Sequence, residues 1–154
     1  MSRKPVSDLE THTGYWLRFV SNHVSQFFAA KLTATGVTVA EWVILREMYG
    51  REDAWLTASA LVTSTGLTKS AISKLLDRLI AKGYVQRQEH DEDRRVQNIR
   101  LTPEASKLVP KLAAIADRND EQFFSVLTSA EQAELMRLLR KLASNHGFRQ
   151  IPID

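Results

Sequence analysis

Residues 56–88 read LTASALVTSTGLTKSAISKLLDRLIAKGYVQRQ. This stretch contains two short helical patterns separated by Gly66, with Thr57 and Thr68 in the positions of their N-caps. The second pattern runs from Lys69 to Lys82, and the glycine after it is expected to end the helix. Two short helices joined by a tight turn that contains glycine form a helix-turn-helix.

The chain changes to an extended pattern directly after the second helix. YVQRQ (84–88) and VQNIRL (96–101) read as strands, and the charged segment EHDEDRR (89–95) lies between them. This arrangement predicts a two-stranded hairpin with a highly charged tip. A helix-turn-helix followed at once by such a hairpin is a winged helix, so we expect a mainly α (α+β) fold.

Helical patterns flank this unit on both sides. Apolar and aromatic side chains recur at spacings of three and four from Tyr15 to Leu32, which predicts one long amphipathic helix that ends near Gly36. The segment TVAEWVILREMYG (38–50) follows as a helix that starts with a capping box. Two further helices are expected after Thr102, the second of which carries a stripe of leucines. Something must cover the apolar stripes at the two ends of the chain.

Composition excludes several classes of protein. The 154 residues contain no cysteine, which rules out disulfides and thiolate metal sites, and the four histidines have no paired spacing typical of zinc. The polar start lacks the apolar run of a signal peptide, and no apolar stretch is long enough to cross a bilayer. We therefore expect a cytoplasmic protein without metal, cofactor or membrane association.

The positive charge is concentrated in one segment. The net charge of the chain is +3, and residues 68–102 contain eight basic and five acidic side chains, whereas the segments on either side are balanced. The excess therefore begins at the second helix of the helix-turn-helix. A polyanion would be attracted there.

On a helical wheel, this second helix has an apolar arc and an opposite polar arc. Long cations alternate with small hydroxyls on the polar arc, which suits insertion into a DNA groove, because serine permits close approach while lysine and arginine reach phosphates or guanine. The residues predicted to contact DNA are Thr68, Lys69, Ser70, Ser73, Lys74 and Arg78. The alternative is the solvated face of an ordinary core helix, which is more common for a face of this kind taken alone.

The expected hairpin tip supplies a second candidate contact. Asp93 and Arg95 are two residues apart, so their side chains can lie on one side and the carboxylate can hold the guanidinium extended toward a minor groove. Arg94 is then left for phosphate. Against this interpretation, the pair can be a surface salt bridge of little weight, and Asp91 and Glu92 add negative charge nearby.

The segment DRRVQNIRLTPEA (93–105) resembles the wing signature of the MarR family of winged-helix regulators. Asp93, Arg95, Leu101 and Thr102 match that pattern, and Ala105 stands where members often have glycine. The resemblance implies homodimers that bind pseudo-palindromic operators and usually repress transcription. It also implies three parts: a dimerisation helix (1–36), a winged helix-turn-helix (37–102) and C-terminal dimerisation helices with a tail (103–154).

Many members of that family release DNA when a small ligand, often phenolic or anionic, binds between the dimerisation helices and the winged domain. Our candidates to line such a pocket are Trp16, His23 and Trp42. Aromatic residues at helical spacing belong more often to a core or a dimer interface, so this alternative stays open.

Three classes of function are therefore compared. The first is a homodimeric, sequence-specific regulator that binds double-stranded DNA and responds to a small aromatic or anionic effector. The second is a winged-helix module that binds an acidic protein partner without sequence-specific DNA binding. The third is an enzyme, which we do not expect, because the sequence lacks a glycine-rich phosphate loop, a nucleophile elbow and a carboxylate pair in a convincing setting.

Overall fold

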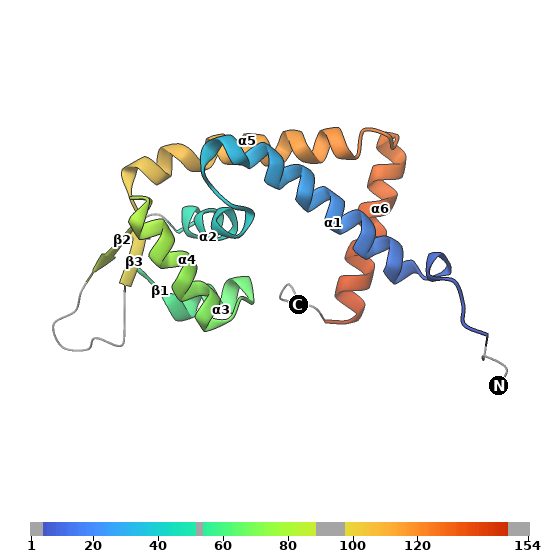
Figure 1. Ribbon diagram of the computed structural model, residues 1–154, viewed down its shortest axis with the longest axis horizontal. Helices are drawn as coiled ribbons and strands as arrows, with labels where there is room; N and C mark the ends of the chain where they lie inside the picture. The colour runs from blue at the N-terminus through green and yellow to red at the C-terminus, as the bar shows by residue number, and fades with distance from the viewer. Residues whose placement is uncertain (1–4, 52–53, 89–97, 148–154) are drawn as a thin grey trace.

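Helices form most of the structure, a computed structural model that describes residues 5–51, 54–88 and 98–147 (Figure 1). The helices are α1 (Thr13–Leu32), α2 (Val39–Tyr49), α3 (Ala58–Thr65), α4 (Lys69–Ala81), α5 (Pro103–Phe123) and α6 (Ser129–Asn145), with two 3-10 turns at Leu9–Thr11 and Thr33–Thr35. The strands are β1 (Leu56–Thr57), β2 (Val85–Gln88) and β3 (Asn98–Leu101).

The predicted starts of α2, α3 and α4 are confirmed, because local capping sets them, whereas α1 ends at Leu32 and a 3-10 turn continues to Thr35 before Gly36. Thr38 and Glu41 form the expected capping box at the start of α2, and the side chains of Thr57 and Thr68 accept backbone N–H groups at the starts of α3 and α4. Gly66 between α3 and α4 has φ 72°, a left-handed conformation that favours glycine and makes the tight turn possible.

The sheet has one strand more than the sequence predicted. Its order is β1-β3-β2, all antiparallel, with Val85 paired to Leu101 and Leu56 paired to Ile99. The second and third strands form the expected hairpin. The additional strand, β1, consists of the two residues directly before α3, too few to produce a recognisable alternating pattern.

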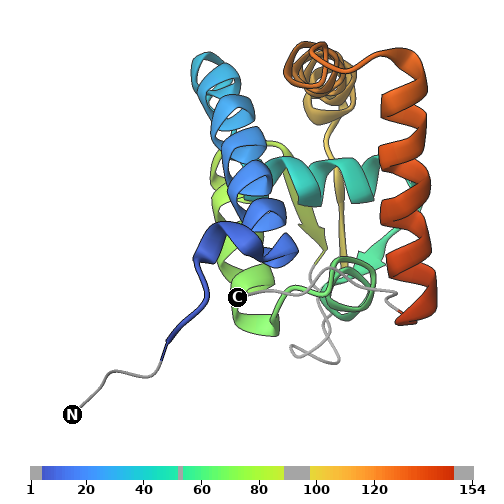
Figure 2. The same cartoon turned by 90° about the vertical axis from the view of Figure 1, so that its right-hand side faces the viewer.

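One continuous core joins the winged unit to the long helices. It contains Leu32 of α1, Ile44 and Leu45 of α2, Leu79 of α4 and Leu112 of α5, all fully buried. Figure 1 shows α5 along the top, above α2, α4 and the sheet, with the C-terminal end of α1 packed against it and the rest of α1 descending to one side, while α6 turns away from the end of α5. In the perpendicular view, α1 and α6 flank the molecule on opposite sides (Figure 2). The core ends before α6, which has no buried residue.

Candidate nucleic-acid interface

The two faces of α4 differ as the helical wheel predicted. Ile72, Leu75, Leu76 and Leu79 are buried in the core. The opposite side is exposed, and it carries every residue of this helix that was predicted to contact DNA: Thr68, Lys69, Ser70, Ser73, Lys74 and Arg78. We call these six residues the α4 face. It is a row of cations and small hydroxyls on one side of a rigid helix, which is the arrangement that a groove-inserted helix requires.

The N-terminal end of α4 lies at the surface. Thr68 Oγ1 accepts a hydrogen bond from the Ala71 N–H at 3.1 Å, and both Lys69 and Ser70 in the first turn are exposed. The first turn contains no acidic residue, in contrast to the first turns of α2, α5 and α6. The positive end of the helix dipole and a lysine therefore coincide at this end, which favours an anion there.

The turn between α3 and α4 supplies its own hydrogen bonds. The buried Thr65 hydroxyl donates to the Leu61 carbonyl at 2.6 Å and accepts the Leu67 N–H at 3.1 Å. The hydroxyl therefore bridges the last turn of α3 and the connection to α4. This fixes where α4 begins relative to α3, and so positions the exposed end of α4.

A contact that the sequence analysis missed joins α4 to the sheet. Arg87 Nη2 of β2 lies 2.9 Å from Asp77 Oδ1 of α4, in an ion pair whose two side chains are 32% and 67% exposed. Arg87 is two residues after the buried Val85, so both side chains point to the side of the strand that packs on α4. This alternation of side chains along β2 is the sequence pattern that indicates that Arg87 faces α4. The pair places a further cation beside the α4 face.

Not every cation of the basic segment points outward. Lys82 is paired with the buried Glu41, and Arg100 donates to Gln86 Oε1 at 3.2 Å while its guanidinium lies 4.5 Å from the centre of the Trp55 ring. Within residues 68–88 and 98–102, the basic side chains without an ion pair, hydrogen bond or ring contact in the structure are Lys69, Lys74 and Arg78. All three belong to the α4 face, so within these ranges the cations available to an external anion are those on the helix, with Arg78 also contributing to the stabilisation of ionised Glu41.

The predicted contacts at the wing tip, Asp93, Arg94 and Arg95, lie outside the described residues. The last described residue of β2, Gln88, is paired with Asn98 at the start of β3. Both strands lead into the segment that contains the three residues. Their proposed role in a minor groove therefore stays a prediction.

The three candidate ligand residues lie on two helices. Trp16 and His23 are seven residues apart on the same side of α1, with Phe19 between them: the Phe19 ring centroid is 5.8 Å from that of Trp16 and 4.4 Å from that of His23. His23 is half-buried, and its Nδ1 atom is buried without a hydrogen-bond partner among the described residues. Trp42 of α2 packs instead on Phe28 at the core, at 6.3 Å between ring centroids.

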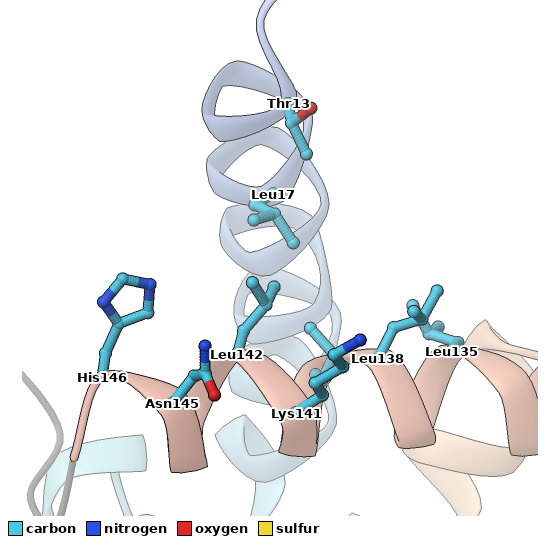
Figure 3. Close-up of a pocket in the computed structure, with 9 residues that line it drawn as sticks. Thr13, Leu17, Leu135, Leu138, Lys141, Leu142, Asn145 and His146 are labelled. Atoms are coloured by element: carbon cyan, nitrogen blue, oxygen red, sulfur yellow. The ribbon is translucent and has the colours of Figure 1, made fainter.

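Two apolar grooves between α1 and α6 are lined by described residues. The larger, of about 610 Å³, is lined by Trp16, Leu17, Val20 and Leu139 among others, and by neither His23 nor Trp42. The second, of about 430 Å³, is shown in Figure 3, where the leucines of α6 point toward Leu17 on α1. A single pocket shared by the three candidate ligand residues thus stays a prediction.

Neither a metal site nor a single membrane-spanning helix is found in the described part of the chain. Residues 5–51, 54–88 and 98–147 contain no group of three histidine or carboxylate side chains arranged to hold a metal ion. By length and composition alone, no single helix there qualifies to cross a bilayer, and one bent pair does, Thr13–Thr35 with Val39–Tyr49, at 79°.

Comparison with known sequences identifies relatives of the winged unit. The family model described as MarR family matches residues 35–96. The transcriptional regulator HosA of Escherichia coli O111:H- is 32% identical over 83 residues, which cover 54% of this chain. The same alignment spans 62% of the length of HosA.

Comparison with solved structures covers nearly the whole chain. A DNA complex of S. aureus MepR is 26% identical and superposes with a TM-score of 0.76 over 87% of this chain and 98% of MepR. BpsR of Bordetella bronchiseptica, whose DNA binding is regulated by 6-hydroxynicotinic acid, has a TM-score of 0.76 at 22% identity over 90% of this chain and 98% of BpsR. These similarities confirm the predicted winged-helix fold with its flanking helices.

Proposed function

Because the chain belongs to the MarR family of winged-helix proteins, we propose that it is a homodimeric, sequence-specific DNA-binding regulator of transcription that acts as a repressor. The observation that carries this proposal is the α4 face. Its three cations have no ion pair with a described residue, and they alternate with serines small enough for the backbone to approach base edges. The DNA complex of MepR, whose fold this chain shares, supports the same assignment.

The docking follows from this geometry. The α4 face enters the major groove, with Ser70 and Ser73 toward base edges and Lys69, Lys74 and Arg78 toward phosphates or guanine. Arg95, held by Asp93, reaches the adjacent minor groove, and Arg94 contacts a phosphate. In a dimer the two α4 helices read half-sites about 10 bp apart on a pseudo-palindromic operator.

The apolar surfaces of α1 and α6 support the dimer. Trp16 and Leu17 of α1 are 46% and 44% exposed, and Leu138 and Leu142 of α6 are 43% and 48% exposed. Soluble monomers rarely leave apolar stripes of this extent uncovered. A second copy that inserts its own helices into the α1–α6 grooves would cover both surfaces through one symmetric interface.

An effector site belongs to the same proposal. We assign Trp16, His23 and Trp42 to the binding of a small aromatic or anionic molecule, with the partner subunit completing the pocket. The buried, unpartnered Nδ1 of His23 is a polar group that such a molecule can satisfy. Titration with 6-hydroxynicotinic acid as the probe should quench tryptophan fluorescence in the native protein. A Trp16→Phe variant that keeps the whole signal would remove Trp16 from the site.

The decisive experiment is selection of duplexes from a random pool, followed by footprinting. We expect an enriched pseudo-palindrome protected over about two helical turns by a dimer. Lys74→Ala should weaken binding to all duplexes similarly and flatten the salt dependence, and Lys107→Ala on the exposed side of α5 is the matched control. No enrichment, together with duplex DNA that fails to displace an acidic protein partner at low salt, would favour the protein-binding alternative.

A further inference from the structure

The side chain of Lys82 joins three segments that are distant in the sequence. Its ammonium donates to the Gly36 carbonyl at 2.7 Å and to both carboxylate oxygens of Glu41, at 3.0 Å and 2.7 Å. Gly36 ends the 3-10 turn that follows α1, Glu41 lies in the first turn of α2, and Lys82 directly follows α4. We call this contact the Lys82 junction. It uses all three donors of the ammonium group.

The carboxylate that accepts from Lys82 is buried, whereas the Gly36 carbonyl belongs to an exposed residue. Glu41 is 1% exposed, and its Oε2 atom also accepts the Thr38 N–H at 3.0 Å as part of the capping box. Burial opposes the charged form of Glu41, but hydrogen bonds from Lys82 and Thr38, with the positive charges of Lys82 and Arg78, outweigh it and hold the pKa below its ordinary value. The carboxylate therefore stays ionised and oriented, unlike the acceptor of a typical surface salt bridge.

The residues next to the junction fasten the same end of α4 to α5. The Thr102 hydroxyl, which caps α5, donates to the Gly83 carbonyl at 2.7 Å, and the Thr102 N–H donates to the Tyr84 carbonyl at 3.1 Å. Farther along, Lys31 of α1 donates to Asn119 and Gln122 of α5. The C-terminal end of α4 is thus attached to a connected pair of helices, α1 and α5.

The N-terminal end of α4, which begins at Lys69 and is proposed to contact DNA, lies at the opposite end of the helix from the Lys82 junction. The 13 residues of α4 place it about 20 Å from the junction. A rotation of only about 10° around the junction would move that end by roughly 3.5 Å, similar to the 3.4 Å rise of one base pair. A small loss of rigidity at Lys82 therefore becomes a change of register at the DNA.

We propose that Lys82 is a positioning residue: through Glu41 and Gly36 it sets the angle of α4 relative to the α1–α5 pair, and so the alignment of the α4 face with its half-site. The role rests on the proposed DNA-binding function. Lys82 itself lies at the C-terminal end of α4, opposite Lys69 and Ser70 and one turn beyond Arg78, and its ammonium contacts protein groups. Its contribution to DNA recognition is the direction of the helix.

The test measures the angle between α4 and the α1–α5 pair separately from the recognition of operator DNA. The chain has no cysteine, so Ser73→Cys on α4 and Lys111→Cys on α5 accept a spin-label pair, and dilution with unlabelled chain leaves one labelled subunit per assembly. Lys82→Met should broaden or shift the interlabel distance by about 2 Å, the displacement that a rotation of about 10° gives at Ser73, whereas the exposed control Lys107→Met should preserve it.

Recognition is measured on the unlabelled variants. Lys82→Met should lower affinity for the selected operator about tenfold, the cost of one or two misplaced base contacts, with little effect on a random duplex. Because Lys82→Met leaves a buried charge unpaired, the double variant with Glu41→Gln is measured as well, and it should show the same loss of specificity in a well-folded protein.

The outcomes separate the two proposals. An unchanged distance in both the single and the double variant overturns the positioning role. So does an unchanged ratio of operator to random-duplex affinity in variants whose distance has shifted. If the native protein binds no duplex but the distance still responds to Lys82→Met, the DNA-binding function fails while the mechanical role of Lys82 holds.

Discussion

Replacement of Lys69 by glutamate should strengthen folding and weaken DNA binding at the same time. Lys69 is the first residue of α4, where the helix dipole disfavours a cation, and it has no ion pair with a described residue. Removal of an unfavourable charge and addition of a favourable one at a helix N-terminus should each contribute about 0.3–1 kcal/mol. The free energy of unfolding should therefore rise by roughly 0.6–2 kcal/mol.

DNA binding should change in the opposite direction. Each subunit of the proposed dimer loses one phosphate contact, so the slope of log affinity against log salt should become shallower by about 1.8 for the dimer. The introduced carboxylate also repels the phosphate. Between 50 and 200 mM salt, the native protein should lose roughly ten times more affinity than the variant does, from the change in slope alone.

The assay combines urea unfolding with fluorescence anisotropy on a selected duplex across a salt series. Lys107→Glu is the matched control, because it produces the same change in net charge at an exposed position on α5 outside the first helical turn. It should leave the salt slope close to that of the native protein. Equal effects of the two substitutions on DNA would show that overall charge, and not the position of Lys69, governs binding. A drop in stability for Lys69→Glu would refute the dipole argument.

Three further predictions follow from individual contacts. Thr68→Ala, which removes the N-cap of α4, should lower the free energy of unfolding by about 1 kcal/mol in urea titrations, whereas Thr68→Ser should preserve it. Leu142→Glu on the half-exposed stripe of α6 should convert the proposed dimer to a monomer in sedimentation experiments, and a dimer that persists would place the interface elsewhere; Arg140→Glu on the same helix is the control. Glu41→Gln should destabilise the protein at neutral pH. Because the pKa of Glu41 is lowered in the folded state, its contribution is present above the unfolded-state pKa of about 4.3 and disappears as the pH falls through the folded value, so the two stability curves should converge in acid.

Local features of the fold were predictable from the sequence. Helix starts depend on a side chain and a backbone group three residues apart, so the caps at Thr38, Thr57, Thr68 and Thr128 are visible as spacings. The buried and exposed faces of α4 follow equally from its 3.6-residue period. The same period places the residues of the α4 face opposite the apolar side of the helix.

Features that depend on distant residues were not predictable in the same way. The Asp77–Arg87 pair spans 10 residues and a change from helix to strand, and the Lys82–Glu41 pair spans 41 residues. The alternation along β2 indicates which side of the strand Arg87 occupies but not its partner, and no local pattern indicates the Lys82–Glu41 pair. Lys82 in particular continues the row of cations in sequence, and only tertiary packing distinguishes its inward role from that of Lys74. The separation of Trp42 from Trp16 has the same origin, because it depends on how α1 crosses α2.

The two ends of α4 use lysine for opposite purposes, and the helix dipole explains why each purpose suits its end. A cation at the C-terminal end is stabilised by the dipole, so Lys82 can be fixed to protein groups there without electrostatic conflict. A cation in the first turn is destabilised by the dipole until an anion arrives, so Lys69 is relieved only when the site is occupied. A helix with this polarity is anchored at one end and left electrostatically unsatisfied at the other. The phosphate backbone of DNA would satisfy the free end, and the anchored end would determine which base edges the helix then meets.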